Sequence, residues 1–359
     1  MERLPRIGYF YSYLPKEILY ALGRVPVRIL PASASAAETE PYLHKNFCAL
    51  AKVTLAQFLE TDAQAEIDLE GVIFGDVCDA QRRLYDVWSR SIHVPVFAFL
   101  DLPRRKDALG IAFFAAALGK LIGQLETQLN QPLSTAALAD AIRVYDEQRQ
   151  IWFELTSAWA QGRVPTGEYY ALRDLRLQGD PLQANHRLSE AVEQAARTSP
   201  RVLKGPRMLL MGSLNVHRGL VRAIGERGAQ VVAEDSACGD RDDGAWQVGT
   251  TATLAKTSAT RAELVGSLAS HYLPSPAPRL RDLPRRLDYL KRLAQTRQAS
   301  AVICSYYKFC DPFLSEFPMV RRFWEEQGLP VLLLEDEGEP DLSGQARTCL
   351  EAFLEMASG

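Results

Sequence analysis

The sequence predicts an α/β fold made of two duplicated parallel-sheet domains of Rossmann or flavodoxin type, with a helical insertion between them. The first observation is a series of short apolar segments that are continuous rather than alternating, which is typical of strands buried on both faces of a parallel sheet. The second is that helical segments of suitable length separate them. The predicted strands are residues 7–10, 25–30, 71–74 and 94–100 in the first half, and 208–211, 230–233, 301–305 and 330–334 in the second.

A third observation is that the two halves repeat one another. In the first half, the third strand leads into a loop with Cys78-Asp79, then a helix and a strand that opens at a proline. In the second half, the third strand leads into a loop with Cys310-Asp311, again followed by a helix and a strand that opens at a proline. The first strand–turn–helix unit also matches, with a serine-containing turn in the first half and Gly212-Ser213 in the second. Any two strand–helix–strand units share part of this pattern, but the order of the features favours a duplicated unit.

A helical stretch from residue 109 to about 197 separates the halves. It includes a helix that begins after the cap residue Ser134, a break at 162–167 and a further helix that begins at Gly179-Asp180-Pro181. Its most apolar helix, residues 109–125, contains Lys120, is too short to span a bilayer and is interpreted as a core helix. The proline- and glycine-containing segment 199–206 is a predicted boundary. We therefore expect an N-terminal domain at 1–105, the insertion at 106–200 and a C-terminal domain at 201–359.

The composition excludes several classes of protein. The chain has 359 residues, of which 47% are apolar and 24% charged, and its formal net charge is −3. These proportions exclude a disordered chain and a small disulfide-stapled scaffold, and they provide no basic field for nucleic acid. No secretory signal pattern opens the sequence. We therefore expect a cytoplasmic protein, bound to neither nucleic acid nor membrane, whose cysteines stay reduced.

The six cysteines are scattered, with no CxxC pair. Cys78 and Cys310 come just after predicted strands, and ligands of open parallel sheets collect beyond the carboxyl ends of the strands. Cys48 lies in a predicted helix, residues 42–59, that follows the second strand, so it is expected near the same edge. Three thiolates from separate segments suit an iron–sulfur cluster with one open position, or a zinc ion with an open site. The alternative is that these cysteines are small core residues.

The remaining candidates carry weaker signals. Cys304 and Cys349 fall within a strand and a helix and are predicted to pack, whereas Cys238 lies in a strand-end loop where a ligand role stays open. Ser12 stands at the carboxyl end of the first strand. Its hydroxyl is predicted either to donate to a carbonyl oxygen or to cap the next helix.

Several short motifs, in order along the chain, resemble one family. They are residues 8–18 (GYFYSYLPKEI), 46–48 (NFC), 78–79 (CD) with 82–88 (RRLYDVW), 308–312 (KFCDP) and 344–348 (GQART). Together they cover nearly the whole chain. The sequence resembles the 2-hydroxyacyl-CoA dehydratase D-component family, which also holds the core subunits of benzoyl-CoA reductases and the double-cubane cluster proteins.

The resemblance implies a function for the predicted site. It implies that Cys48, Cys78 and Cys310 bind a 4Fe–4S cluster, or a related cluster of higher nuclearity. It also implies a homologous second subunit and a separate ATP-hydrolysing iron–sulfur activator that delivers a low-potential electron. The electron acts on an acyl-CoA thioester, whose oxygen Ser12 is then a candidate to bind. The loop at 234–241 and Cys349 depart from the family pattern, which leaves open which subunit of a pair this chain is.

Two further functions stay open from the sequence. The enzymatic alternative is a subunit of an ATP-dependent benzoyl-CoA reductase, which acts on an aromatic acyl-CoA. The alternative from another class is a non-catalytic module of two domains that binds a small ligand, with its cysteines in the core. Iron and sulfide content would separate the module from both enzymes.

Overall fold

The computed structural model describes residues 4–31, 36–59, 68–201, 205–242, 259–278, 282–339 and 341–358. It contains two four-stranded sheets, in each of which every paired strand runs parallel to its neighbour. The first sheet has the order β2-β1-β3-β4 and the second the order β6-β5-β7-β8. The strands are β1 Arg6–Tyr9, β2 Val25–Arg28, β3 Gly71–Gly75, β4 Val96–Leu100, β5 Arg207–Gly212, β6 Gln230–Asp235, β7 Ala301–Tyr307 and β8 Val331–Asp336. The predicted fold class and all eight predicted strands are confirmed.

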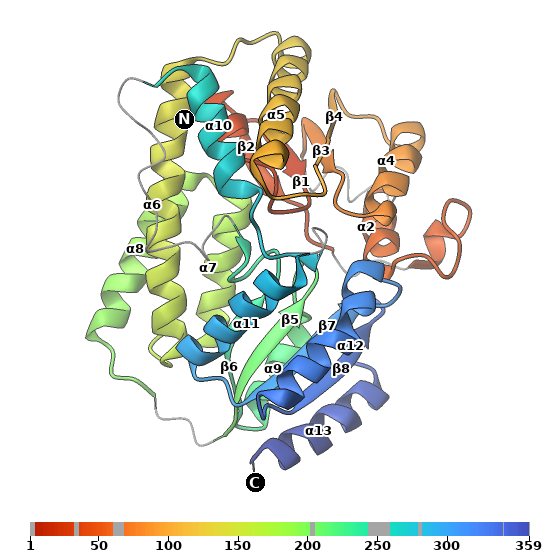
Figure 1. Ribbon diagram of the computed structural model, residues 1–359, viewed down its shortest axis with the longest axis vertical. Helices are drawn as coiled ribbons and strands as arrows, with labels where there is room; N and C mark the ends of the chain where they lie inside the picture. The colour runs from red at the N-terminus through yellow and green to blue at the C-terminus, as the bar shows by residue number, and fades with distance from the viewer. Residues whose placement is uncertain are drawn as a thin grey trace.

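The helices follow the strands in the alternating order that a parallel sheet requires. Four of them, α5 to α8, form the stretch between the two sheets. The helices are α1 Lys16–Ala21, the 3₁₀ helix η1 Ala36–Thr39, α2 Ala49–Leu59, α4 Asp79–Ser91, α5 Ala108–Leu129, α6 Thr135–Ala160, α7 Thr166–Gln178, α8 Pro181–Arg197, α9 Arg218–Glu226, α10 Arg261–Tyr272, α11 Leu283–Arg297, α12 Asp311–Glu326 and α13 Gly344–Ser358. Figure 1 shows the first sheet above the second, with α6, α7 and α8 along one side of the molecule.

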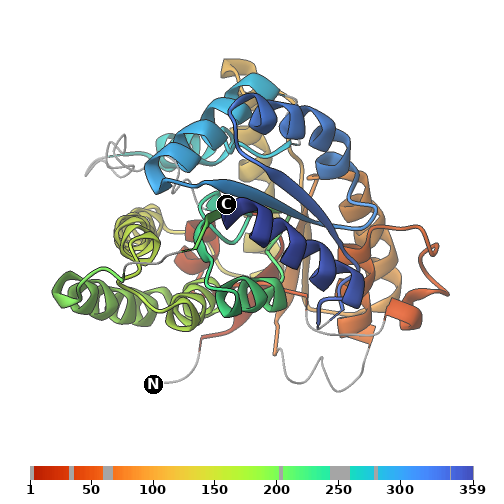
Figure 2. The ribbon, with the colours of Figure 1, turned by 90° about the horizontal axis from the view of Figure 1, so that it is seen from below.

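The two sheets repeat each other in register as well as in order. Ile7 of β1 lies opposite Gly71 of β3, and Met208 of β5 lies opposite Ala301 of β7. In the second sheet, α9 and α13 cover one face while α11 and α12 cover the other, as Figure 2 shows from below. Both halves are therefore open α/β sheets. In such sheets, ligands bind beyond the carboxyl ends of the strands.

A hydrophobic cluster joins the two halves. Phe74 and Trp88 of the first half belong to the same buried cluster as Cys304 and Trp324 of the second. Because this shared core spans the junction, the strand ends of the two halves are held at fixed positions relative to each other.

The apolar helix α5 has two different faces. Phe114, Leu118 and Ile122 are buried, and the helix packs on β4 and α10, so the predicted core role is confirmed for this face. Leu109 and Phe113 are 66% and 53% exposed, so for the opposite face the prediction is wrong. Within the described residues α5 is the one helix whose length and composition would let it cross a membrane, so the prediction that this segment is too short to span a bilayer is wrong.

One predicted helix begins later than expected. Residues 42–48 lie outside any helix, and α2 starts at Ala49. The cause is a turn at His44, whose carbonyl oxygen accepts from the Phe47 amide and whose Nδ1 accepts from the Asn46 amide. The Ala49 amide then donates to the Lys308 carbonyl oxygen of the second half, so the helix begins where the two halves meet. Cys48 is thereby placed just before a helix rather than within one.

Candidate functional site

Three cysteines occupy the same local position, each just before a helix. Cys48 precedes α2, Cys78 precedes α4 at the end of β3, and Cys310 precedes α12 after β7. Backbone amides of the following helix donate to each sulfur, from Leu50 and Ala51 to Cys48 and from Phe313 to Cys310. Cys78 likewise accepts from amides in the first turn of α4. Unpaired amides and the helix dipole make a helix N-terminus favourable for a thiolate.

The three cysteines share one cavity between the halves. It has a volume of about 550 Å³, and Cys48, Cys78, Cys310 and Tyr11 all line it. Cys48 and Cys310 are buried and Cys78 is partly exposed. A cavity of this size is typical of a ligand site. The prediction that these three residues lie close to one edge is therefore confirmed, although their binding of a metal is not tested by the geometry.

Burial and the neighbouring sulfurs shift the pKa values of the groups in the cavity. Burial is the main cause that raises the pKa of Cys78 to about 12. The Cys310 thiol donates to Cys48, which lowers the pKa of Cys48 and raises that of Cys310. Burial, followed by the nearby cysteines, also raises the pKa of Tyr11 well above its usual value. A cation held among these sulfurs would reverse the pattern, because a bound metal supplies the missing positive charge.

The described side chains do not form a preformed site for a single metal ion. Among the described residues, no three His, Cys, Asp or Glu side chains lie close enough together to hold one metal ion. The three thiols nevertheless line one cavity. The binding of a metal group by these thiols therefore stays a prediction.

The other cysteines lie apart from this cavity. Cys304 is buried in β7, where its thiol contacts the Met211 sulfur at 3.9 Å, so its predicted packing role is confirmed. Cys349 is exposed on α13, so the prediction of packing is wrong there. Cys238 is fully buried after β6 and lines neither this cavity nor the smaller one behind it.

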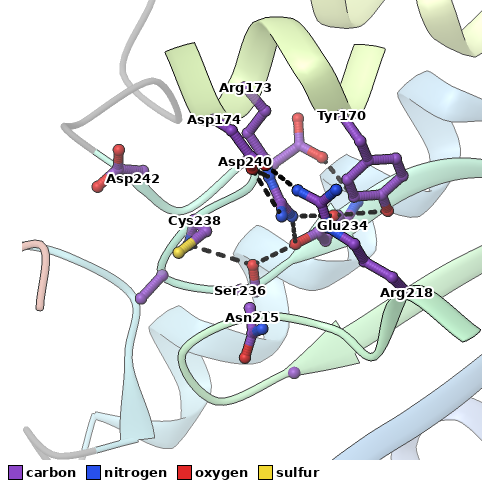
Figure 3. Close-up of polar contacts among 12 residues, drawn as sticks. Tyr170, Arg173, Asp174, Asn215, Arg218, Glu234, Ser236, Cys238, Asp240 and Asp242 are labelled. Carbon is purple, nitrogen blue, oxygen red and sulfur yellow. Dashed lines mark hydrogen bonds and ion pairs between the residues drawn. The ribbon is translucent and has the colours of Figure 1, made fainter. Parts of the chain in front are cut away.

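Cys238 belongs to a polar cluster around Glu234, drawn in Figure 3. The Ser236 hydroxyl donates to Glu234 at 2.6 Å and accepts from the Cys238 amide at 3.2 Å. From α7, Tyr170 and Arg173 donate to the same carboxylate, at 2.9 and 3.2 Å. Because all these groups are hydrogen bonded and Glu234 is fully buried, the cluster ties the insertion to the second sheet.

Ser12 is held in a second buried network. Its hydroxyl lies 2.8 Å from Asp242 Oδ1 and 2.9 Å from the Ala237 carbonyl oxygen, both of which accept from it. The residue before α1 is Pro15, with no side-chain cap, so the alternative prediction that Ser12 caps this helix is wrong. Its role as a donor to substrate stays a prediction. The single hydroxyl proton is already used by acceptors within the protein.

Asp242 is the centre of that network. Arg28 from the first sheet binds it at 2.6 Å and Arg176 from α7 at 2.7 Å, and the side chains of all three are almost fully buried. Burial alone would raise the pKa of Asp242, but Arg28 and Arg176 hold it well below the usual range. One carboxylate thus joins the first half, the insertion and the second half. Sequence reasoning missed this site because no local pattern links residues so far apart.

A smaller inner cavity adjoins the first. Its volume is about 40 Å³, and Ser12, Ser213, Arg241 and Phe313 are among its lining residues. Tyr11, Cys78 and Cys310 line both cavities, so the inner one adjoins two of the three cysteines, whereas Cys48 lines only the larger cavity.

Comparison with known proteins identifies the family. The family model for the 2-hydroxyglutaryl-CoA dehydratase D-component matches residues 11–357. The chain therefore belongs to this family, as the motifs predicted. Its relatives are enzyme subunits that include the (R)-phenyllactyl-CoA dehydratase beta subunit of Clostridium sporogenes, 24% identical over 97% of this chain and 91% of the relative. The beta subunit of (R)-2-hydroxyglutaryl-CoA dehydratase from Acidaminococcus fermentans has the same identity and coverage. A benzoyl-CoA reductase subunit of Thauera aromatica is 23% identical over 91% of this chain and 84% of its own length.

Proposed function

We propose that this chain is the iron–sulfur subunit of a 2-hydroxyacyl-CoA dehydratase-type enzyme. In this proposal it acts on an acyl-CoA thioester with a low-potential electron from a separate ATP-hydrolysing iron–sulfur activator. The observation that carries the proposal is that Cys48, Cys78 and Cys310, each before a helix, line one cavity between the halves. The relatives named as acyl-CoA dehydratase beta subunits support the reaction class and a second subunit, which we propose is homologous to this chain.

The residues of the cavity fit a 4Fe–4S cluster, or a related larger cluster, held by the three cysteines. When bound, the cluster would supply single electrons at low potential. The chain itself would contribute three thiolates, and the amides of three helix starts would stabilise the charge on the sulfurs. The apolar wall that includes Val77, Pro278 and Met319 would limit the entry of water. We place the protein in the cytoplasm, where thiols stay reduced.

The enzymatic alternative is an aromatic acyl-CoA reductase, supported by the relative named as a benzoyl-CoA reductase subunit. Both reactions would use the same cysteines, so the cavity does not separate them. An assay with the second subunit, the activator, ATP and a panel of 2-hydroxyacyl and aromatic CoA esters would do so. Loss of water from a 2-hydroxyacyl ester supports the main proposal, and ring reduction supports the alternative.

The cluster itself is tested by iron and acid-labile sulfide content after anaerobic purification and reconstitution. We expect a brown protein that loses most of its iron when Cys48, Cys78 or Cys310 is replaced by Ala. Cys304→Ala is the matched control, because Cys304 is buried, as Cys48 and Cys310 are, but does not line the cavity. A wild-type protein without iron after reconstitution would contradict the proposal, as would iron loss in the control but not in the three variants.

A further inference from the structure

The two halves carry equivalent serines at the ends of β1 and β5. In register, Ile7 corresponds to Met208, because each lies opposite the first residue of the neighbouring strand, Gly71 or Ala301. Ser12 and Ser213 follow these residues at the same interval along the chain. Both serines line the inner cavity.

Within the described part of the chain, Ser213 is bound through its backbone alone. Its carbonyl oxygen accepts from Arg241 Nη2 at 2.8 Å and from the Ala237 amide at 3.2 Å. Its side chain is 1% exposed, and its hydroxyl has no hydrogen-bond partner among the described residues. The position of Ser213 is thus fixed, while its donor is left available.

An unpaired buried hydroxyl has a cost in free energy, and native proteins retain few such groups. Ser213 lines a cavity that adjoins the three-cysteine cavity, because Tyr11, Cys78 and Cys310 line both, and this position makes a ligand atom the natural partner for its hydroxyl. The inner cavity, at about 40 Å³, has room for an oxygen atom and its immediate neighbours, whereas the larger cavity has room for the rest of a substrate.

We propose that the Ser213 hydroxyl donates a hydrogen bond to the carbonyl oxygen of the acyl-CoA thioester. This inference rests on the proposed function and adds a substrate-binding residue to it. Arg241 also lines the inner cavity, where its guanidinium pairs with the buried Asp235 carboxylate and donates to the Ser213 carbonyl oxygen, which fixes the position of Ser213. Ser12 lines the same cavity, but its proton is engaged by Asp242 and Ala237.

A binding experiment with the reconstituted enzyme, second subunit included, tests the hydrogen bond. The probes are an acyl-CoA thioester that is turned over and the matching thioether, in which a methylene replaces the carbonyl. We expect Ser213→Ala to weaken thioester binding about three- to tenfold and leave thioether binding unchanged. Ser213→Thr, which keeps the hydroxyl, should bind the thioester more tightly than the thioether, as the wild type does. Equal thioester preference in Ser213→Ala and wild type would overturn the inference, and would also be the result if a buried water alone occupied the cavity.

The outcomes for Ser213 and for the proposed function are distinguishable. If the wild type binds the thioester and Ser213→Ala binds it equally well, the role of Ser213 is wrong and the function stands. If the wild type binds neither probe, the proposed acyl-CoA substrate is wrong, and the proposed role of Ser213 is wrong as well. Thermal unfolding gives an independent readout. Ser213→Ala should unfold at the wild-type temperature or above, and a marked decrease would show that the hydroxyl is structural.

Discussion

The first strand of each sheet ends near a serine, yet the two serines have different surroundings. Ser12 donates into a buried network with Asp242, which Arg28 and Arg176 neutralise. Ser213 lines the same inner cavity with a hydroxyl that no described residue binds. The two serines therefore share an equivalent backbone position but differ in role. The Ser12 side chain joins parts of the molecule, whereas the Ser213 hydroxyl is available to a ligand.

The cysteines show the same contrast between the halves. The first half supplies Cys48 and Cys78, and the second supplies Cys310. Gly75, the last residue of β3, corresponds in register to Ser305 of β7. β7 continues for two residues beyond this point, so Cys310 follows Ser305 at a longer interval along the chain than Cys78 follows Gly75. The repeat is thus inexact at the edge where the ligand would bind, and this asymmetry lets three cysteines from two similar halves line a single cavity.

The largest effect is expected from removal of the carboxylate that joins the halves. Asp242→Ala leaves Arg28 and Arg176 buried without their anion, which we expect to cost about 3–5 kcal/mol of unfolding free energy. Urea denaturation measures the change. Asp341→Ala is the control, because its ion pair with Arg222 is exposed and should contribute less than about 1 kcal/mol. Equal losses in the two variants would show that Asp242 does not join the three parts as described.

A pH-dependent effect is expected at the loop that follows β4. Burial lowers the pKa of Lys106 to about 8, and its ammonium donates to the Ser275 carbonyl oxygen at 2.8 Å. Between pH 8 and its ordinary value near 10.5, the unfolded state binds a proton that the folded state has released, so stability rises with pH. Relative to Lys106→Met, the wild type should gain roughly 1–3 kcal/mol across this interval.

The second half offers the control for this prediction. Lys308 is exposed and bound to Glu337, a contact that raises its pKa. A raised lysine pKa gives stability that is lost only as pH passes above the ordinary value, so the wild type should gain no stability relative to Lys308→Met between pH 8 and 10. Parallel pH profiles for wild type and Lys106→Met would contradict the proposed burial of Lys106.

The serine pair should give a smaller and asymmetric effect. Ser12→Ala removes a buried donor to Asp242, and we expect a loss of about 1–2 kcal/mol in urea denaturation. Ser213→Ala should not destabilise the protein, since that hydroxyl has no partner to lose among the described residues. Similar losses of unfolding free energy in Ser12→Ala and Ser213→Ala would mean that both hydroxyls are bound within the protein. The contrast on which the inference about Ser213 depends would then be absent.

The sequence could predict those features that local pattern determines. The continuous apolar segments predicted all eight strands. The rule that ligands of a parallel sheet bind beyond the carboxyl ends of its strands predicted that Cys78 and Cys310 lie at one edge. Cys48 was expected near that edge but within a helix. The helix instead begins at Ala49, whose amide donates to the Lys308 carbonyl oxygen of the other half, a contact that no local pattern predicts. The convergence of Arg28, Arg176 and Asp242 could not be predicted, since it depends on long-range packing between segments with no shared local signal.

The smallest effect is expected at two helix ends. Asn130, after α5, and Gln298, after α11, both have left-handed backbone conformations, with φ of 47° and 53°. Gly adopts this conformation without strain and Asn tolerates it, whereas Gln does so at a cost. Gln298→Gly should therefore stabilise the protein by about 0.5–1 kcal/mol in urea denaturation, and Asn130→Gly by less. A larger gain at Asn130 than at Gln298 would show that the conformation of the cap residue does not determine the stability of these helix ends.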